Sequence, residues 1–302
     1  MAAVGLQTYE DASRREDLVD IVTNISPQET PLLSGLGEGP TGMQTLHEYM
    51  TATLASAADN ANVEGKAFTV KDLSQPSRAN NINQIFRADL MVTGTELSVN
   101  TGAMISPMEY QVEKNLKEHA RDIELALMAG SKASGDSNSA RRLGGVINSI
   151  TTNFTSYPSG TSFTETAFND VIGTIWTSTD MVADEIYSGS FLKRRISELT
   201  AGNTRFVSAD DRRLVKPVDV YESDFGPHKV FLHRNVVDSA TNRQLVAIRN
   251  EFWKISFLNN RRTKVVDLLP DGDRERKMIV TELTLENRGE AANAKAEWRN
   301  IS

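Results

Sequence analysis

Cysteine is absent from the 302 residues of this chain, and histidine occurs only four times. The absence of cysteine excludes disulfides, thiolate metal sites and cysteine nucleophiles, and it suits a protein made in a reducing cytoplasm. No run approaches the roughly 18 apolar residues of a membrane-spanning helix. Residues 1–10 also lack the basic start and apolar core of a signal peptide. We therefore expect a soluble protein that is not exported.

An excess of positive charge is also lacking, because the formal net charge is −7 and the sequence pI is about 5.3. The summed field of such a chain does not favour binding to a phosphate backbone. Short basic clusters do occur, and we interpret them as solvated or interface charges. A nucleic-acid-binding module that uses these clusters stays an alternative. They are Arg141-Arg142, Lys193-Arg194-Arg195, Arg212-Arg213 and Arg261-Arg262-Thr263-Lys264.

Motifs that carry chemistry are few. Gly37–Gly42 has the G-x-G-x-x-G spelling of a dinucleotide loop, but it follows a helical turn and opens a strand, so we interpret it as a hinge. His47-Glu48 is not completed as a zinc motif because position 51 is Thr. His228 and His233 are five residues apart, which places them on opposite faces of one strand. The sequence predicts no catalytic, cofactor-binding or metal-binding residue; a hydrolase whose triad forms only in the fold stays an alternative.

The most informative segment is a polar arm from Thr45 to Gly94, between two capped helix starts at Ser26–Glu29 and Ser106–Glu109. Residues 45–51 and 83–92 alternate apolar and polar side chains, as half-buried strands do. The two predicted strands, with the residues between them, indicate a β-hairpin. Because an isolated hairpin is only marginally stable in water, we expect it to lie on a neighbouring subunit.

Helical periodicity is strongest from Pro107 to Ala129, where one apolar stripe is formed by Met108, Val112, Leu116, Ala120, Ile123 and Leu127. After Phe163 the pattern becomes a mixed α/β subdomain. It predicts helices over 165–178 and 190–199. It predicts strands near 218–221, 229–233 and 244–248, a long strand over 277–286 and a final one within 293–301.

Several short sequence motifs, and the order in which they occur, resemble those of the major capsid proteins of tailed bacteriophages. The resemblance covers nearly the whole chain and implies an α+β fold of the Hong Kong ninety-seven capsid type. The motifs are Ser26-Pro27-Gln28-Glu29-Thr30-Pro31, Val63-Glu64-Gly65, Asn83-Gln84-Ile85, Val92-Thr93-Gly94-Thr95, Arg121-Asp122-Ile123-Glu124, Val220-Tyr221-Glu222-Ser223-Asp224-Phe225-Gly226 and Thr281-Glu282-Leu283-Thr284-Leu285.

The resemblance also implies a division of the chain. Residues 1–36 would form an N-terminal arm and short helix, and residues 37–95 an extended β-hairpin loop. Residues 96–162 and 261–302 would form a peripheral domain with a long spine helix over 107–129, and residues 163–260 an α/β axial domain.

The function that the resemblance implies is structural and not enzymatic. The chain would self-assemble into pentamers and hexamers of an icosahedral head, in the virion, after assembly in the host cytoplasm. The shell would enclose double-stranded DNA without binding it tightly. The expected partners are further copies of the chain with portal, scaffolding and decoration proteins, and no membrane or cofactor. Because only about 25 residues precede Ser26, we expect a separate scaffolding protein. A bacterial nanocompartment shell, similar to encapsulins, is the alternative.

Charged residues of the arm and the long helix are the candidate inter-subunit contacts. Some capsid relatives link an arm lysine covalently to a neighbour's asparagine, and two lysines of this arm are placed for such a link. The candidates are Glu64, Lys66, Lys71, Arg78, Arg87, Glu113, Lys117 and Arg121.

Overall fold

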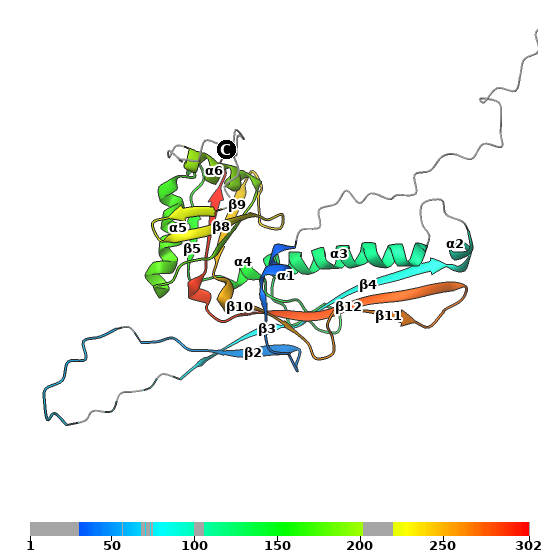
Figure 1. Ribbon diagram of the computed structural model, residues 1–302, viewed down its shortest axis with the longest axis horizontal. Coiled ribbons are helices and arrows are strands. Elements are labelled where there is room, and N and C mark those ends of the chain that lie inside the picture. The colour runs from blue at the N-terminus through cyan, green and yellow to red at the C-terminus, as the bar shows by residue number, and fades with distance from the viewer. Residues whose placement is uncertain are drawn as a thin grey trace, which may run out of the picture.

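A computed structural model describes residues 30–55, 57–67, 70, 73, 75–99, 106–201 and 220–301. It contains a five-stranded sheet, a six-stranded sheet and a separate two-stranded hairpin. In Figure 1 the hairpin projects from one side of the molecule, and the long helix α3 runs along the five-stranded sheet toward the other side. Among the helices in these ranges, none has both the length and the apolar character needed to cross a bilayer. The N-terminal capping box predicted at Ser26–Glu29 lies outside the described residues.

The five-stranded sheet is built on β12 (Arg274–Asn287), the longest strand. One edge of β12 pairs antiparallel with β4 (Gln84–Thr93). Its other edge pairs first with β11 (Lys264–Leu268) and then with β10 (Trp253–Phe257). The short strand β1 (Gly37–Glu38) adds to β10 in parallel. The long strand predicted over 277–286 is confirmed.

Helix α3 (Pro107–Ala129) has the bounds that the sequence predicted. Its N-cap is Ser106, whose hydroxyl accepts a hydrogen bond from the Glu109 N–H at 3.4 Å. The apolar stripe lies on β4 and β12, and the buried His119 Nε2 lies 2.9 Å from Thr281 Oγ1 of β12. A short helix, α2 (Gly94–Ser98), connects the end of β4 toward α3.

The six-stranded sheet has the order β5-β13-β9-β6-β8-β7. Helices α5 (Glu165–Thr179) and α6 (Ser190–Ala201) belong to the core on one of its faces. The other face contributes Tyr187, Val246 and Ile248 to the core that also holds the C-terminal part of α3. The strands are β5 (Phe154–Tyr157), β6 (Glu185–Ser188), β7 (Val220–Ser223), β8 (Gly226–Leu232), β9 (Asn242–Ile248) and β13 (Ala294–Arg299).

Short elements connect the two sheets. Helix α1 (Pro31–Gly35) and α4 (Val146–Ser149) pack beside α3, and the 3-10 turns η1 (Asn250–Phe252) and η2 (Glu290–Ala292) lead into β10 and β13. The chain therefore leaves the six-stranded sheet after β9, completes the five-stranded sheet through β12, and returns with β13.

The predicted partner of the first hairpin strand was wrong. Strand β2 (Leu46–Thr51) pairs antiparallel with β3 (Ser77–Ile82), whereas residues 84–93 form β4 and pair with β12. The alternation within 83–92 correctly indicates a strand, but its buried side chains, such as Phe86 and Leu90, face the core beneath α3. Strand β3 carries Asn80 and Asn81, a residue type depleted in strands, which explains why it was not predicted.

The core between α3 and β12 gives a direct test of this packing. Leu127 of α3 is fully buried among core residues of both sheets. We expect Leu127→Ala to lower the free energy of unfolding of the unassembled chain by about 2–5 kcal/mol, through lost burial and a cavity. Leu269→Ala, at a leucine that is 88% exposed in the turn between β11 and β12, should change it by less than about 0.5 kcal/mol. Urea denaturation measures both; equal values would contradict the assigned core.

Candidate functional site

The base of the projecting hairpin is fixed by a buried asparagine. Asn81 of β3 donates from Nδ2 to the carbonyls of Gly144 at 2.9 Å and Leu285 at 2.7 Å. Its Oδ1 accepts from the N–H groups of Gly144 and Ile82, each at 2.8 Å. One side chain therefore joins β3 both to β12 and to the loop before α4. Because its amide is fully hydrogen-bonded, removing it would leave buried backbone groups unpaired.

A second anchor ties β2 to the end of β12. His47 Nε2 lies 2.7 Å from Glu286 Oε1, and Arg288 Nε donates to Glu286 Oε2 at 2.7 Å. The Tyr49 hydroxyl accepts from the Asn287 N–H at 3.0 Å, and burial raises the pKa of this phenol. These contacts fix the base of the arm against the end of β12.

The pKa of Glu286 is the net result of opposing effects. Burial raises it, but the hydrogen bonds from His47 and Arg288 outweigh burial and hold the pKa below its usual value of 4.5. The folded state therefore favours the carboxylate more strongly than the unfolded chain does. The contribution of the ionised Glu286 carboxylate to folding stability is complete above pH 4.5 and is lost as pH falls through the lowered pKa.

The Glu286→Gln variant tests this anchor. At pH 7 we expect it to be less stable than the unchanged protein by about 1–3 kcal/mol, because a charge-assisted acceptor is replaced by an amide. The difference should shrink as pH falls below 4.5, as measured by urea denaturation between pH 7 and 3. Glu48→Gln, at a more exposed carboxylate of the same hairpin, should show no such loss. A pH-independent difference would show that ionisation of Glu286 plays no part.

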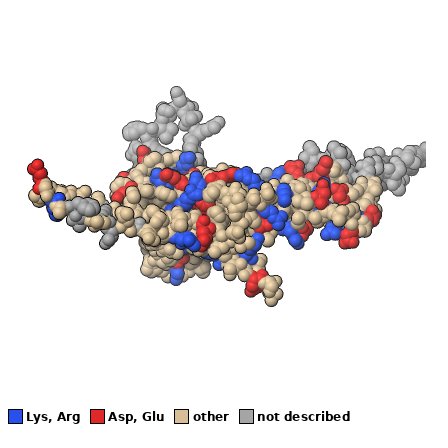
Figure 2. Space-filling view, turned by 90° about the horizontal axis from the view of Figure 1, so that it is seen from below, with Lys and Arg blue, Asp and Glu red and all other residues tan. Residues whose placement is uncertain are grey.

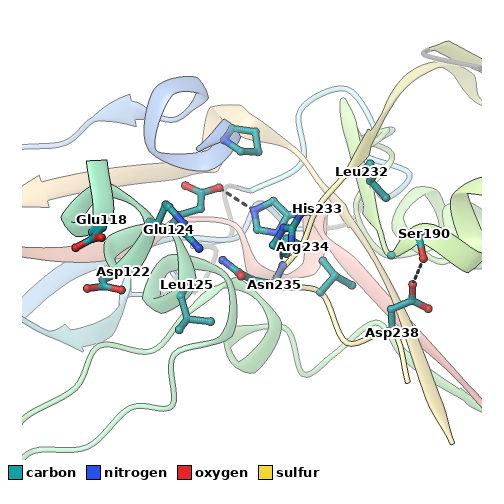
Figure 3. Close-up of a pocket in the computed structure, with 14 residues that line it drawn as sticks. Glu118, Asp122, Glu124, Leu125, Ser190, Leu232, His233, Arg234, Asn235 and Asp238 are labelled. Carbon is teal, nitrogen blue, oxygen red and sulfur yellow. Dashed lines mark hydrogen bonds and ion pairs between the residues drawn. The ribbon is translucent and has the colours of Figure 1, made fainter. Parts of the chain in front are cut away.

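Glu124 forms a joint between three parts of the chain. Its Oε1 accepts from the Leu32 N–H at 2.9 Å and lies 2.7 Å from His233 Nε2; its Oε2 accepts from the Leu33 N–H at 2.9 Å. Figure 3 shows the carboxylate pointing from α3 toward His233. Both side chains are buried, at 3% and 2% exposed. One carboxylate therefore fixes the start of α1 and the segment after β8 against α3.

Sequence reasoning missed this joint. Glu124 was noted only within the capsid-like motif Arg121-Asp122-Ile123-Glu124, and His233 only as one of two histidines on opposite faces of a strand. The spacing signal that was present is that Glu124 lies beside the stripe residues Ile123 and Leu127. It borders the apolar face, where an acidic side chain needs a buried partner.

We expect Glu124→Gln to lower the free energy of unfolding by about 1–3 kcal/mol, because the amide nitrogen would face an N–H donor in place of an acceptor. Glu118→Gln, on the exposed face of the same helix, is the matched control and should change stability by less than about 0.5 kcal/mol. Urea denaturation gives the cost, and hydrogen exchange at Leu32 and Leu33 shows whether α1 loosens. Equal stability of the two variants would contradict the joint.

The predicted contact residues that the structure describes do not form one patch. Glu64 and Lys66 lie in a turn of the arm in which Gly65 takes a φ of 76° and the Lys66 N–H donates to the Val63 carbonyl at 3.1 Å. Lys71 lies outside the described residues. Arg78 pairs with Glu48 across the hairpin at 3.4 Å, and Arg87 of β4 pairs with Asp89 at 2.8 Å.

The remaining candidates lie on α3. Glu113 and Lys117 form an i,i+4 ion pair at 2.7 Å, and the hydrogen bond from Lys117 lowers the pKa of Glu113. Arg121 borders a groove between α3 and the six-stranded sheet. The structure thus brings Glu113 and Lys117 together and leaves the arm residues apart from them.

Figure 2 shows Lys and Arg side chains interspersed with Asp and Glu side chains on the face that it presents. Arg141 and Arg261 both bond to the buried Glu282, at 2.8 and 2.9 Å, and Arg262 pairs with Glu38. These ion pairs support a structural role for Arg141, Arg261 and Arg262, whereas the cluster Arg212-Arg213 lies outside the described residues. Within the described ranges, no group of three or more His, Cys, Asp or Glu side chains is placed to hold a metal ion.

Comparison with solved structures defines the class of fold. The capsid of cyanophage A-1(L) matches with a TM-score of 0.69 at 12% identity, over 98% of this chain and 99% of that chain. The capsid of a native GTA particle matches with a TM-score of 0.67 at 12% identity, over 97% and 96%. The SrpI encapsulin of Synechococcus elongatus PCC 7942 matches with a TM-score of 0.60 at 10% identity, over 96% and 93%. The fold is therefore the α+β capsid fold of the Hong Kong ninety-seven type.

Within this class, the SU10 major capsid protein family matches residues 4–300, and the chain belongs to that family. It is a family of capsid proteins and not of enzymes. The major capsid protein of Escherichia phage Phieco32 is 29% identical over 124 residues, which is 41% of this chain and 35% of that relative. The matched part is thus about a third of the curated relative's length.

Proposed function

We propose that the chain is the major capsid protein of a tailed phage and self-assembles into the pentamers and hexamers of an icosahedral head. Family membership and the capsid fold support this function. The observation that carries it is the arm, a two-stranded sheet that pairs with no other described strand. Such an arm requires a second surface, and copies of one chain arranged in rings supply it.

Exposed apolar side chains along the arm strengthen this argument. Leu54 is 95% exposed and Leu73 is 88% exposed. Between Thr51 and Ser77, the described residues contain no helix or strand. Burying a leucine side chain contributes about 1.5–3 kcal/mol to stability. Contact with a neighbouring subunit would therefore order the arm and stabilise the association.

The charged candidates fit the same scheme as inter-subunit contacts. Glu64, Lys66 and Lys71 would meet a neighbour from the arm, Arg78 from β3 and Arg87 from β4. Glu113, Lys117 and Arg121 would make contacts from α3. A covalent link from Lys66 or Lys71 stays a hypothesis, which denaturing gels of assembled shells would support through a ladder of higher-mass bands.

The two sheets supply the modules of the proposed subunit. The five-stranded sheet with α3 would be the peripheral module, the six-stranded sheet with α5 and α6 the axial module, and β2 with β3 the extended loop. Sheet membership supports placing β10 with the peripheral module and β5 and β13 with the axial module. The approximate boundaries drawn from sequence, 37–95, 96–162, 163–260 and 261–302, would be adjusted accordingly.

The proposed location is the virion, after assembly in the host cytoplasm. Portal, scaffolding and decoration proteins are the proposed partners.

The chain's net charge of −7 and its paired basic residues support a wall that encloses DNA without binding it tightly. A nanocompartment shell is the rival, supported by the encapsulin match at a TM-score of 0.60. Shells purified from infected cells should contain DNA; protein cargo in place of DNA would favour the rival.

Shortening the arm tests self-assembly. Thr51 pairs with Ser77 at the last position of the hairpin, so residues 52–76 can be replaced by Asn-Gly, which favours a tight type I′ turn. We expect the shortened chain to fold, because the contacts of Asn81 and Glu286 remain. It should yield only small oligomers by sedimentation velocity, whereas the full chain yields shells by electron microscopy.

The full chain should be tested alone and with its scaffolding protein. Normal shells from the shortened chain would contradict the role of the arm. Failure of the full chain to form shells under every condition would contradict the proposed function.

A further inference from the structure

His119 occupies a position on α3 where the helix otherwise buries apolar side chains. Periodicity predicted Ala120 as the stripe residue of this turn, but the structure buries His119, which is 3% exposed. His119 lies three residues after Leu116 and four before Ile123, and these spacings place the three side chains on one face of the helix. An ionisable group therefore lies in the contact between α3 and the five-stranded sheet, where an aliphatic side chain would pack without hydrogen bonds.

Three neighbouring segments surround the imidazole of His119. Its Nε2 lies 2.9 Å from Oγ1 of Thr281 on β12, and that hydroxyl donates to Oγ1 of Thr263, just before β11, at 2.8 Å. Because the single hydroxyl hydrogen of Thr281 is used on Thr263, His119 Nε2 carries the hydrogen shared with Thr281. Phe86 of β4 meets the imidazole edge to face, with ring centroids 6.2 Å apart. The neutral imidazole satisfies this site with one N–H.

The surroundings of His119 give little support to a second proton. Asp122, exposed on the next turn of α3, acts to raise the pKa of His119, but burial acts more strongly and lowers this pKa below its usual value of 6.5. The groups that face the ring from the other segments are the two uncharged hydroxyls and the aromatic ring. Glu282 follows Thr281 on β12 and therefore points to the opposite face of the sheet, where two arginines hold it. A protonated His119 would be a buried cation without a hydrogen-bonded counter-ion, which is costly.

His119 also lies between two cores of unequal size. Toward the C-terminus of α3, Leu127 belongs to the large core that both sheets share. Toward the N-terminus, Met108 belongs to a small cluster with Leu90 and Ile279. In Figure 1 this N-terminal half of α3 extends away from the six-stranded sheet, along β4 and β12. Because a region with few buried apolar contacts opens at a lower free energy, this half of the helix depends most on the contact that His119 makes.

We propose that His119 is an acid-sensitive catch, which holds the N-terminal half of α3 on the five-stranded sheet while neutral and releases it when protonated. The released segment is Pro107–Glu118, whereas the helix from Ile123 onward stays in place because Glu124 and Leu127 hold it. This catch is a property of the single subunit and does not depend on shell formation.

The direction of the pH effect follows from the site. Burial lowers the pKa of His119 in the folded chain, so the unfolded chain takes up this proton more readily as pH falls. The stabilisation from His119 is therefore fully present above the usual pKa of 6.5 and is lost as pH falls through the lowered pKa.

Hydrogen exchange of the full-length, unassembled chain at pH 7.5 and pH 5.0 tests the catch, once rates are corrected for the intrinsic effect of pH on exchange. We expect the protection of α3 amides at residues 111–118 to fall at least about fivefold at the lower pH. His119→Leu, which is apolar and takes up no proton, should abolish this fall. Glu118→Gln, at the exposed neighbouring residue, is the matched control and should leave the fall unchanged.

A second measurement uses the unchanged chain and so does not depend on the folding of a variant. The imidazole of His119 is titrated by NMR, and its midpoint should lie below pH 6.5 and coincide with the loss of α3 protection. Three results would each overturn the proposal: a midpoint at or above 6.5, no fall in protection in the unchanged chain, or an equal fall in His119→Leu.

Discussion

Pairing along both edges of β12 is the constraint on which the rest of the structure depends. This strand joins β4 on one side and β11 and β10 on the other. From Ile279 to Asn287 every residue is buried, so both faces must be covered. Leu283 and Leu285 enter the core with α3, while the flanking Glu282 and Glu286 need polar partners. Those partners fix the loops around the sheet and the base of the arm.

Buried polar groups therefore determine where the parts of the subunit lie, while the apolar core supplies most of the stability. Asn81 and Glu286 hold the arm at its base, and Glu124 holds α1 and the six-stranded sheet against α3. Breaking such a contact leaves unpaired groups, which costs more than the contact contributes when intact. A subunit built in this way holds its arm at the base and exposes the apolar side chains of Leu54 and Leu73 along it.

Periodicity in the sequence was enough to predict α3 with its bounds, the helices α5 and α6 and the long strand β12, because each has a strong local pattern. It was not enough for the partner of β2. The alternation of residues 83–92 is the same whether the strand pairs with β2 or β12, and the Asn-rich β3 has weak local preference for a strand. Glu124, Glu282 and Glu286 each have at least one partner more than 100 residues away. A single sequence shows their charge but not the burial that gives them a function.

Hydrogen exchange compared between unassembled subunits and assembled shells tests the central claim most directly, which is that the arm gains its missing partner from a neighbour. Amides of β2 and β3 beyond the anchored base, at Met50 and Thr51 and at Ser77 and Arg78, should exchange much more slowly in shells. Amides of β12 from Ile279 to Leu285, already paired and buried within the subunit, should change little. Equal exchange of the hairpin amides in both states would contradict the account.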